Sequence, residues 1–184
     1  ADARLIAEWV SPELGVIVNA VNKYSNNVMA RQLLLSLGEA VYGAGVTERE
    51  GAQVVRNWLS GKGISVAELT IENGSGLSRE EKITPSTMAQ ILKAAYQSPV
   101  MPELMASLPL VGRDGTMSKR LRDDEIAGKA HVKTGAIKDV RAVAGYVLAK
   151  SGKRYLVVCL VNHPEAWRAR EMMNHLLSWT YANG

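Results

Sequence analysis

The sequence predicts an α+β protein in which helices flank an antiparallel sheet. The first half contains helix start signals and apolar residues spaced three or four apart. The second half changes period and contains three short runs rich in Val and Ala, each bounded by turn residues. Helices followed by a meander of strands and a last helix favour a covered antiparallel sheet over a parallel one.

Three helices are expected before the strands begin. Ser11 and Pro12 suit the N-cap and first position of the first helix. A second apolar run, Val28–Leu37, closes at Gly38, where we expect the second helix to end. Thr47–Glu50 has the sequence of a capping box and starts the third helix.

The remaining elements follow from turn residues and strand composition. Leu69–Glu72 suggests a short strand, and Thr84-Pro85 starts another helix. The expected strands are Ala130–Thr134, Val140–Ala149 and Arg154–Asn162, and a final helix begins at Pro164. Because only four residues, Lys150–Lys153, separate the last two strands, we expect these strands to form an antiparallel hairpin.

The last strand lacks an obvious second neighbour. Tyr155–Val161 is apolar at every position, which predicts that both faces are buried and both edges are paired. Only the preceding strand is available beside it, and an open apolar edge would favour aggregation. We therefore expect a further neighbour: another segment, another chain, or the stretch Arg4–Val10.

Composition excludes several classes of protein. A chain of 184 residues, 47% hydrophobic, can bury a core as one or two domains, so disorder is excluded. The single cysteine, Cys159, cannot support a disulfide scaffold, and no apolar run is long enough to cross a membrane. The net charge of +4 is too small to predict a nucleic-acid partner.

Two short motifs are candidates for chemistry. Lys133-Thr134-Gly135 places an ammonium and a hydroxyl on one strand, which suits the binding of a carboxylate. Because successive side chains alternate, Lys133 and Thr134 would serve one ligand only at the edge of the sheet. Ser25 precedes the second helix, and its alternative role is a helix N-cap. The alternative for Lys133 is an exposed lysine.

Other familiar sites are absent from the sequence. It contains no Gly-x-Ser-x-Gly elbow, phosphate loop, Cys-x2-Cys pair or His-Glu-x2-His motif. The three histidines are scattered, and we expect each of them to be structural. No metal or organic cofactor is therefore predicted.

The order of the motifs resembles one family. Ser25-Asn26-Asn27, the Asn73–Arg79 loop, the Asp114–Met117 loop and Lys133-Thr134-Gly135 follow one another as in the penicillin-binding protein 4 type of D-alanyl-D-alanine carboxypeptidase/endopeptidase. The resemblance extends from about Val16 to Tyr181. It implies a β-lactamase/transpeptidase-like fold and a serine hydrolase of peptidoglycan peptides.

The resemblance also implies roles for individual residues. Ser25 would relay a proton to the leaving amine, Asn27 would hold an amide carbonyl of the substrate, and Lys133 would bind its terminal carboxylate. The carried-over substrate-binding positions are Thr134 beside that carboxylate, Gly135 for space, and Ala136 as a backbone donor to the oxyanion.

One family motif is missing. The nucleophile of this family lies in a Ser-x-x-Lys motif, and no serine of this sequence has Lys three residues later. We therefore expect residues 1–184 to be the C-terminal part of one transpeptidase-like domain. Its expected partners are an N-terminal segment of the same protein (possibly a separate chain), stem peptides ending in D-Ala-D-Ala, and β-lactams. The resemblance implies a periplasmic location.

Two other interpretations stay open at this point. A serine β-lactamase-like hydrolase shares the Lys-Thr-Gly strand, and a non-catalytic peptidoglycan-binding module would keep the carboxylate site without the chemistry. The Asn73–Arg79 and Asp114–Met117 loops also fit simple tight turns, because their glycines suit positive φ angles.

Overall fold

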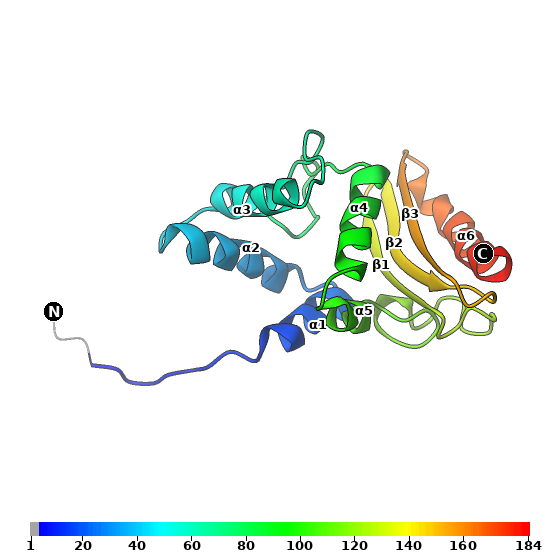
Figure 1. Cartoon of the computed structure of the whole chain (residues 1–184), viewed down its shortest axis with the longest axis horizontal. Helices are drawn as coiled ribbons and strands as arrows, with labels where there is room; N and C mark the ends of the chain where they lie inside the picture. Colours follow the sequence, from blue (N-terminus) through cyan, green and yellow to red (C-terminus); the bar gives the residue numbers. More distant parts are fainter. Residues whose placement is uncertain (1–3) are drawn as a thin grey trace.

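The computed structural model describes residues 4–184 and contains one antiparallel sheet with helices on both faces (Figure 1). The sheet has the strand order β1-β2-β3, with β1 at Ala130–Ile137, β2 at Val140–Leu148 and β3 at Arg154–Asn162. The β2–β3 hairpin is confirmed, and β1 extends three residues beyond the predicted Thr134. The predicted α+β class is correct.

One face of the sheet packs against the last helix, α6 (Ala169–Asn183). Val132, Val143 and Val147 of the sheet share a fully buried core with Met173 and Leu177. A short 3-10 turn, Ala166–Arg168, precedes α6, so the helix begins five residues later than Pro164 predicts. This core is the main apolar contribution to the stability of the fold.

The other face is covered by α4 (Pro85–Tyr96) and α5 (Met101–Ser107). Tyr146 of β2 is buried against Leu92 and Met105, and its hydroxyl donates to the carbonyl of Leu92 at 2.7 Å. Thr84 caps α4 through the backbone N–H of Thr87, as its sequence predicts. Helix α5 was not predicted from the sequence, and it has only seven residues.

Helices α1 (Leu14–Tyr24), α2 (Asn27–Tyr42) and α3 (Glu48–Gly61) precede the sheet, and α2 and α3 project away from it (Figure 1). The capping box of α3 is confirmed, since the Thr47 N–H donates to Glu50 at 2.6 Å. The predicted end of α2 at Gly38 is wrong. A Cβ on Gly38 would lie 3.0 Å from the backbone N of Gly51, so this glycine allows α2 and α3 to approach closely.

Two further predictions are wrong, and one of the three candidate neighbours of the last strand does not pair with it. α1 begins at Leu14 rather than at Pro12. Leu69–Glu72 is no strand; a single bridge joins Thr70 to Lys82. Arg4–Val10 has no regular structure and pairs with no strand, and Trp9 is 90% exposed.

The outer edge of β3 therefore has no neighbouring strand within residues 4–184. The prediction that both faces of β3 are buried holds only in part. Val157 is buried, but Leu156 is exposed and the remaining apolar residues of the strand are half-buried. No helix of the described chain is both long enough and apolar enough to cross a bilayer.

Candidate active site

Ser25 occupies the joint between α1 and α2. It adopts the left-handed conformation, with φ of 55°, and caps the C-terminus of α1. The side chain of the next residue, Asn26, caps α2 by accepting from the backbone N–H of Met29 at 3.1 Å. Ser25 is thus not the N-cap that the alternative reading predicts. Its hydroxyl is free of capping bonds and is directed at β1.

Lys133 of β1 lies directly opposite this joint. Its ammonium donates to the hydroxyl of Ser25, which is 108 residues away in the sequence, and to the carbonyl of Thr134 at 3.0 Å. Burial lowers the pKa of Lys133, because a partly desolvated ammonium loses the stabilisation that water gives it. The structure therefore brings the two separate motifs together around one amine.

The outer edge of β1 is closed along its first half and open along its second. Val132 donates to the carbonyl of Pro109 and Val111 donates to that of Ala130, both at 2.9 Å. No backbone segment of residues 4–184 pairs with this edge beyond Val132. Because the N–H groups alternate along an antiparallel strand, those of Thr134 and Ala136 point outward in the same direction as that of Val132.

Because successive side chains alternate, Lys133 and Thr134 can serve one ligand only at an edge of the sheet, and this open edge meets that condition. Lys133 curls back to the carbonyl of Thr134, so its ammonium reaches the edge where the backbone of Thr134 and Ala136 is exposed. Gly135 adds no side chain there, and it is itself exposed. An anion at this edge would meet an ammonium, a hydroxyl and backbone N–H groups, which is the chemistry that a carboxylate or an oxyanion requires.

Thr116 is a site neighbour that the sequence analysis did not single out. It lies in the short 3-10 turn Gly115–Met117, and its hydroxyl is 3.1 Å from that of Thr134. One signal for Thr116 was present in the sequence, since the Asp114–Met117 loop belongs to the resemblance. By contrast, Asn27 is half-buried at the first position of α2, and its side chain makes no hydrogen bond within residues 4–184.

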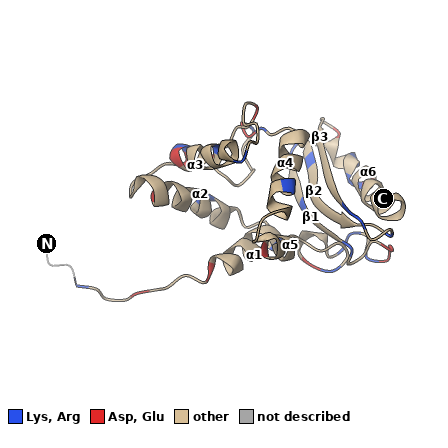
Figure 2. Cartoon of the chain, in the orientation of Figure 1, with Lys and Arg blue, Asp and Glu red and all other residues tan. Residues whose placement is uncertain are grey.

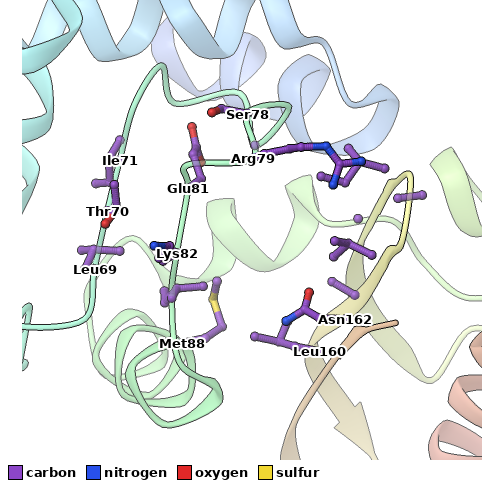
Figure 3. A pocket seen from close by; sticks show the side chains of 17 residues that line it. Leu69, Thr70, Ile71, Ser78, Arg79, Glu81, Lys82, Met88, Leu160 and Asn162 are labelled. Carbon is purple, nitrogen blue, oxygen red and sulfur yellow. The ribbon is translucent and has the colours of Figure 1, made fainter. Parts of the chain in front are cut away.

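A cleft of about 590 Å³ continues from the Gly135–Ile137 end of β1 (Figure 3). It runs between the ends of the strands and the 69–83 segment, and Figure 3 shows the side chain of Arg79 extending across it toward the β1–β2 turn. Arg79 donates to the carbonyl of Lys138 at 3.2 Å and lies 3.9 Å from the carboxylate of Asp139. The cleft thus has a mixed lining, with Leu160 and Met88 on its apolar side.

The Asn73–Arg79 loop divides into two parts with different roles. Ser75 donates to the side-chain oxygen of Asn73 through both its hydroxyl, at 2.6 Å, and its N–H, at 3.0 Å. These bonds form a tight Asx-type turn, so the structural interpretation holds for Ser75. Arg79, at the end of the loop, instead faces the cleft.

Charged side chains of both signs are spread over the chain and are not gathered around the site. Lys and Arg segments are distributed over the chain with Asp and Glu segments among them (Figure 2). Within residues 4–184, no group of three His, Cys, Asp or Glu side chains is arranged to hold a metal ion. The polar groups that the structure brings together at the site are the ammonium of Lys133 and the hydroxyls of Ser25, Thr134 and Thr116.

The fold defines a class, the β-lactamase/transpeptidase-like proteins. The crystal structure of penicillin binding protein 4 from Haemophilus influenzae matches with a TM-score of 0.78 and 25% identity, over 88% of this chain and 39% of that one. The TLA-3 extended-spectrum β-lactamase matches with a TM-score of 0.64, over 93% of this chain and 64% of that one. At 17% identity, it shows the fold alone.

Within that class, the model of the D-Ala-D-Ala carboxypeptidase 3 (S13) family matches residues 1–182, and the chain belongs to this family. A D-alanyl-D-alanine carboxypeptidase of an Actinomadura species is 35% identical over 167 residues, which are 88% of this chain and 30% of that protein. The carboxypeptidase DacB of Haemophilus influenzae is 28% identical over 86% of this chain and 34% of its own length. The chain thus spans about a third of these relatives.

Proposed function

We propose that residues 1–184 form the C-terminal part of a serine-type D-Ala-D-Ala carboxypeptidase/endopeptidase domain that acts on peptidoglycan peptides. The observation that carries this proposal is the hydrogen bond from Lys133 to Ser25 beside the open edge of β1. The nucleophile would lie in a segment outside these residues, because no Ser-x-x-Lys motif occurs among them. Below, "the complete protein" means this chain together with that segment.

The proposed reaction passes through an acyl-enzyme. The nucleophilic serine attacks the carbonyl carbon between the two D-Ala residues, and the C–N bond breaks as the leaving amine takes a proton through Ser25. Water then hydrolyses the ester. Lys133 and Thr134 bind the terminal carboxylate, Asn27 holds an amide of the substrate, and the N–H of Ala136 is one of two oxyanion donors.

The geometry supports these roles to different degrees. The outward N–H of Ala136 and the space at Gly135 suit a substrate carbonyl at the open edge. The cleft beyond Ala136 would receive the rest of the peptide. For Asn27 the support is its position at the start of α2, two residues after Ser25. The family and the substrate imply a periplasmic location and inhibition by β-lactams.

Labelling of the complete protein with a fluorescent penicillin tests the proposal. We expect a stable covalent adduct, and we expect Ser25→Ala to slow its formation because the proton relay is lost. A protein that is never labelled, yet binds D-Ala-D-Ala peptides with Lys133-dependent affinity, would be a binding module. Rapid turnover of a chromogenic cephalosporin would instead favour a β-lactamase, the class to which TLA-3 belongs.

A further inference from the structure

The C-terminal end of α1 is joined to the rest of the molecule by buried polar contacts. Lys23 is the only buried residue of α1. Its ammonium lies 2.6 Å from a carboxylate oxygen of Asp114 and donates to the carbonyl of Leu108 at 2.8 Å. The other carboxylate oxygen of Asp114 accepts from the N–H of Leu110 at 2.7 Å. Lys23 is two residues before Ser25, so these bonds fix the helix end that carries the hydroxyl.

Gly115 brings two backbone segments together at the same place. Its φ is +53°, and a Cβ on it would lie 2.6 Å from the carbonyl oxygen of Lys23. Contacts that short essentially never occur for real Cβ atoms, so any side chain here would push the turn away from α1. Glycine is required for this approach.

Thr116 completes the connection on the other side. Its hydroxyl lies 3.1 Å from that of Thr134, the residue that follows Lys133 on β1. Three consecutive residues therefore contact both sides of the site, the end of α1 and strand β1. Asp114 and Gly115 contact Lys23 of α1, and Thr116 contacts Thr134 of β1. We call Asp114, Gly115 and Thr116 the 114–116 turn.

We infer that the 114–116 turn, together with Lys23, positions Ser25 and Thr134 against each other in the reaction. This inference rests on the proposed function. Lys23, Asp114 and Thr116 are positioning residues: they act through Ser25 and Thr134. The ion pair suits this task, because its bonds are directional and the ammonium of Lys23 is buried, where an unpaired charge is costly.

Lys23→Met in the complete protein is the first test. Met keeps most of the length of the side chain and removes the ammonium, while Asp114, whose side chain is 44% exposed, can be solvated by water. We expect the rate constant of acylation by benzylpenicillin to fall about tenfold to a hundredfold, the cost of misplacing a reacting group by about 1 Å. Lys150→Met is the matched control: it makes the same change in the ion pair with Glu125, away from the site.

Thr116 gives a second, independent readout. We expect Thr116→Val to weaken the initial binding of substrate more than the acylation step, because its partner Thr134 binds the carboxylate. Thr116→Ser keeps the hydroxyl and should restore binding; a purely structural role for the side chain would not distinguish Ser from Val in this way.

Combining the two variants tests whether the turn acts as one element. The double variant Lys23→Met/Thr116→Val should lose less activity than the product of the single losses, since both act through the 114–116 turn. Fully multiplicative losses would contradict a shared element. If Lys23→Met fails to fold, Asp114→Asn replaces it: it removes the anion opposite Lys23 and keeps an acceptor for the N–H of Leu110.

The outcomes separate the two proposals. If the unaltered protein forms no adduct with benzylpenicillin, the proposed function fails. If it forms one, and folded Lys23→Met or Asp114→Asn reacts at the same rate, only the positioning role of the turn is overturned. A loss of rate that Lys150→Met reproduces would also overturn that role, because the effect would then be one of charge alone.

Discussion

The sheet with α4, α5 and α6 differs sharply from the three helices that precede it. Around the sheet, residues such as Val132, Val143 and Leu177 are fully buried in a continuous core. In α1 no apolar side chain is fully buried: Leu14 and Val16 are exposed, at 63% and 59%, and the other aliphatic side chains are half-buried. The sheet is therefore held by a buried apolar core, whereas the one buried side chain of α1 is a lysine that makes polar contacts. The candidate site lies where these two regions meet.

This difference explains why the site is built from bonds between charged and polar groups. Asn22 donates to Ser107 at 2.7 Å, Lys23 pairs with Asp114, and Ser25 accepts from Lys133. All three contacts join α1 to the region around the sheet. The same side chains that hold α1 in place thus surround the proposed reaction centre, so a change in one of them can affect the chemistry more than the fold.

The largest expected effect is that of Lys133→Ala. Removal of the ammonium eliminates the carboxylate partner and the bond to Ser25, so acylation of the complete protein should slow about a hundredfold or more. Because the apolar core around the sheet does not include Lys133, the unfolding midpoint should hardly change. Lys138→Ala, an exposed lysine at the turn after β1, is the control. A collapse of stability in Lys133→Ala would contradict the contrast between the two regions.

Substitutions of apolar residues compare the two regions through their effect on the free energy of unfolding. Leu177→Ala should lower the free energy of unfolding by about 3 kcal/mol, since it leaves a cavity in the core between the sheet and α6. Leu14→Ala should cost less than about 1 kcal/mol, because Leu14 is mostly exposed in α1. Urea denaturation measures both. Equal losses would show that α1 is packed as firmly as the sheet.

The smallest expected effect concerns His131, which lies on β1 two residues before Lys133. Its Nδ1 is buried without a hydrogen-bond partner in the described chain. Burial lowers the pKa of His131, and the nearby ammonium of Lys23 lowers it further. As the pH falls below about 6.5, His131 therefore binds a proton in the unfolded chain before it does so in the folded chain. The free energy of unfolding declines from that pH toward the lowered pKa of the folded state.

His131→Gln should reduce the loss of stability that occurs as the pH falls, and thermal unfolding between pH 7 and pH 5 would measure this loss. His175→Gln, which changes an exposed histidine of α6, is the matched control. An identical pH dependence in His131→Gln and the unaltered protein would show that His131 titrates normally.

Local sequence patterns predicted the elements whose signals lie within a few residues of each other. The hairpin across Lys150–Lys153 and the capping box at Thr47 depend on such short-range rules, and both formed. Gly38 was misread because a glycine that ends a helix and one that allows close helix packing look alike in sequence. Arg4–Val10 has the composition of a strand, but strand formation requires a partner.

Residues of the site could be predicted from the sequence, but the contacts between them could not. The order of the motifs identified Ser25 and Lys133, yet residues 108 apart carry no local signal that they touch. The pairing of Lys23 with Asp114, 91 residues away, was not predicted, because a lysine and an aspartate in separate segments are usually exposed. Only the tertiary structure shows that the 114–116 turn joins the two sides of the site.

The central claim is that these residues supply the Ser25 and Lys133 side of a site whose nucleophile lies elsewhere in the protein. The most direct test is peptide mapping by mass spectrometry after the complete protein has reacted with benzylpenicillin. Our account predicts an adduct on a serine outside residues 1–184, with every peptide of this chain unmodified. An adduct on any residue of this chain would contradict it.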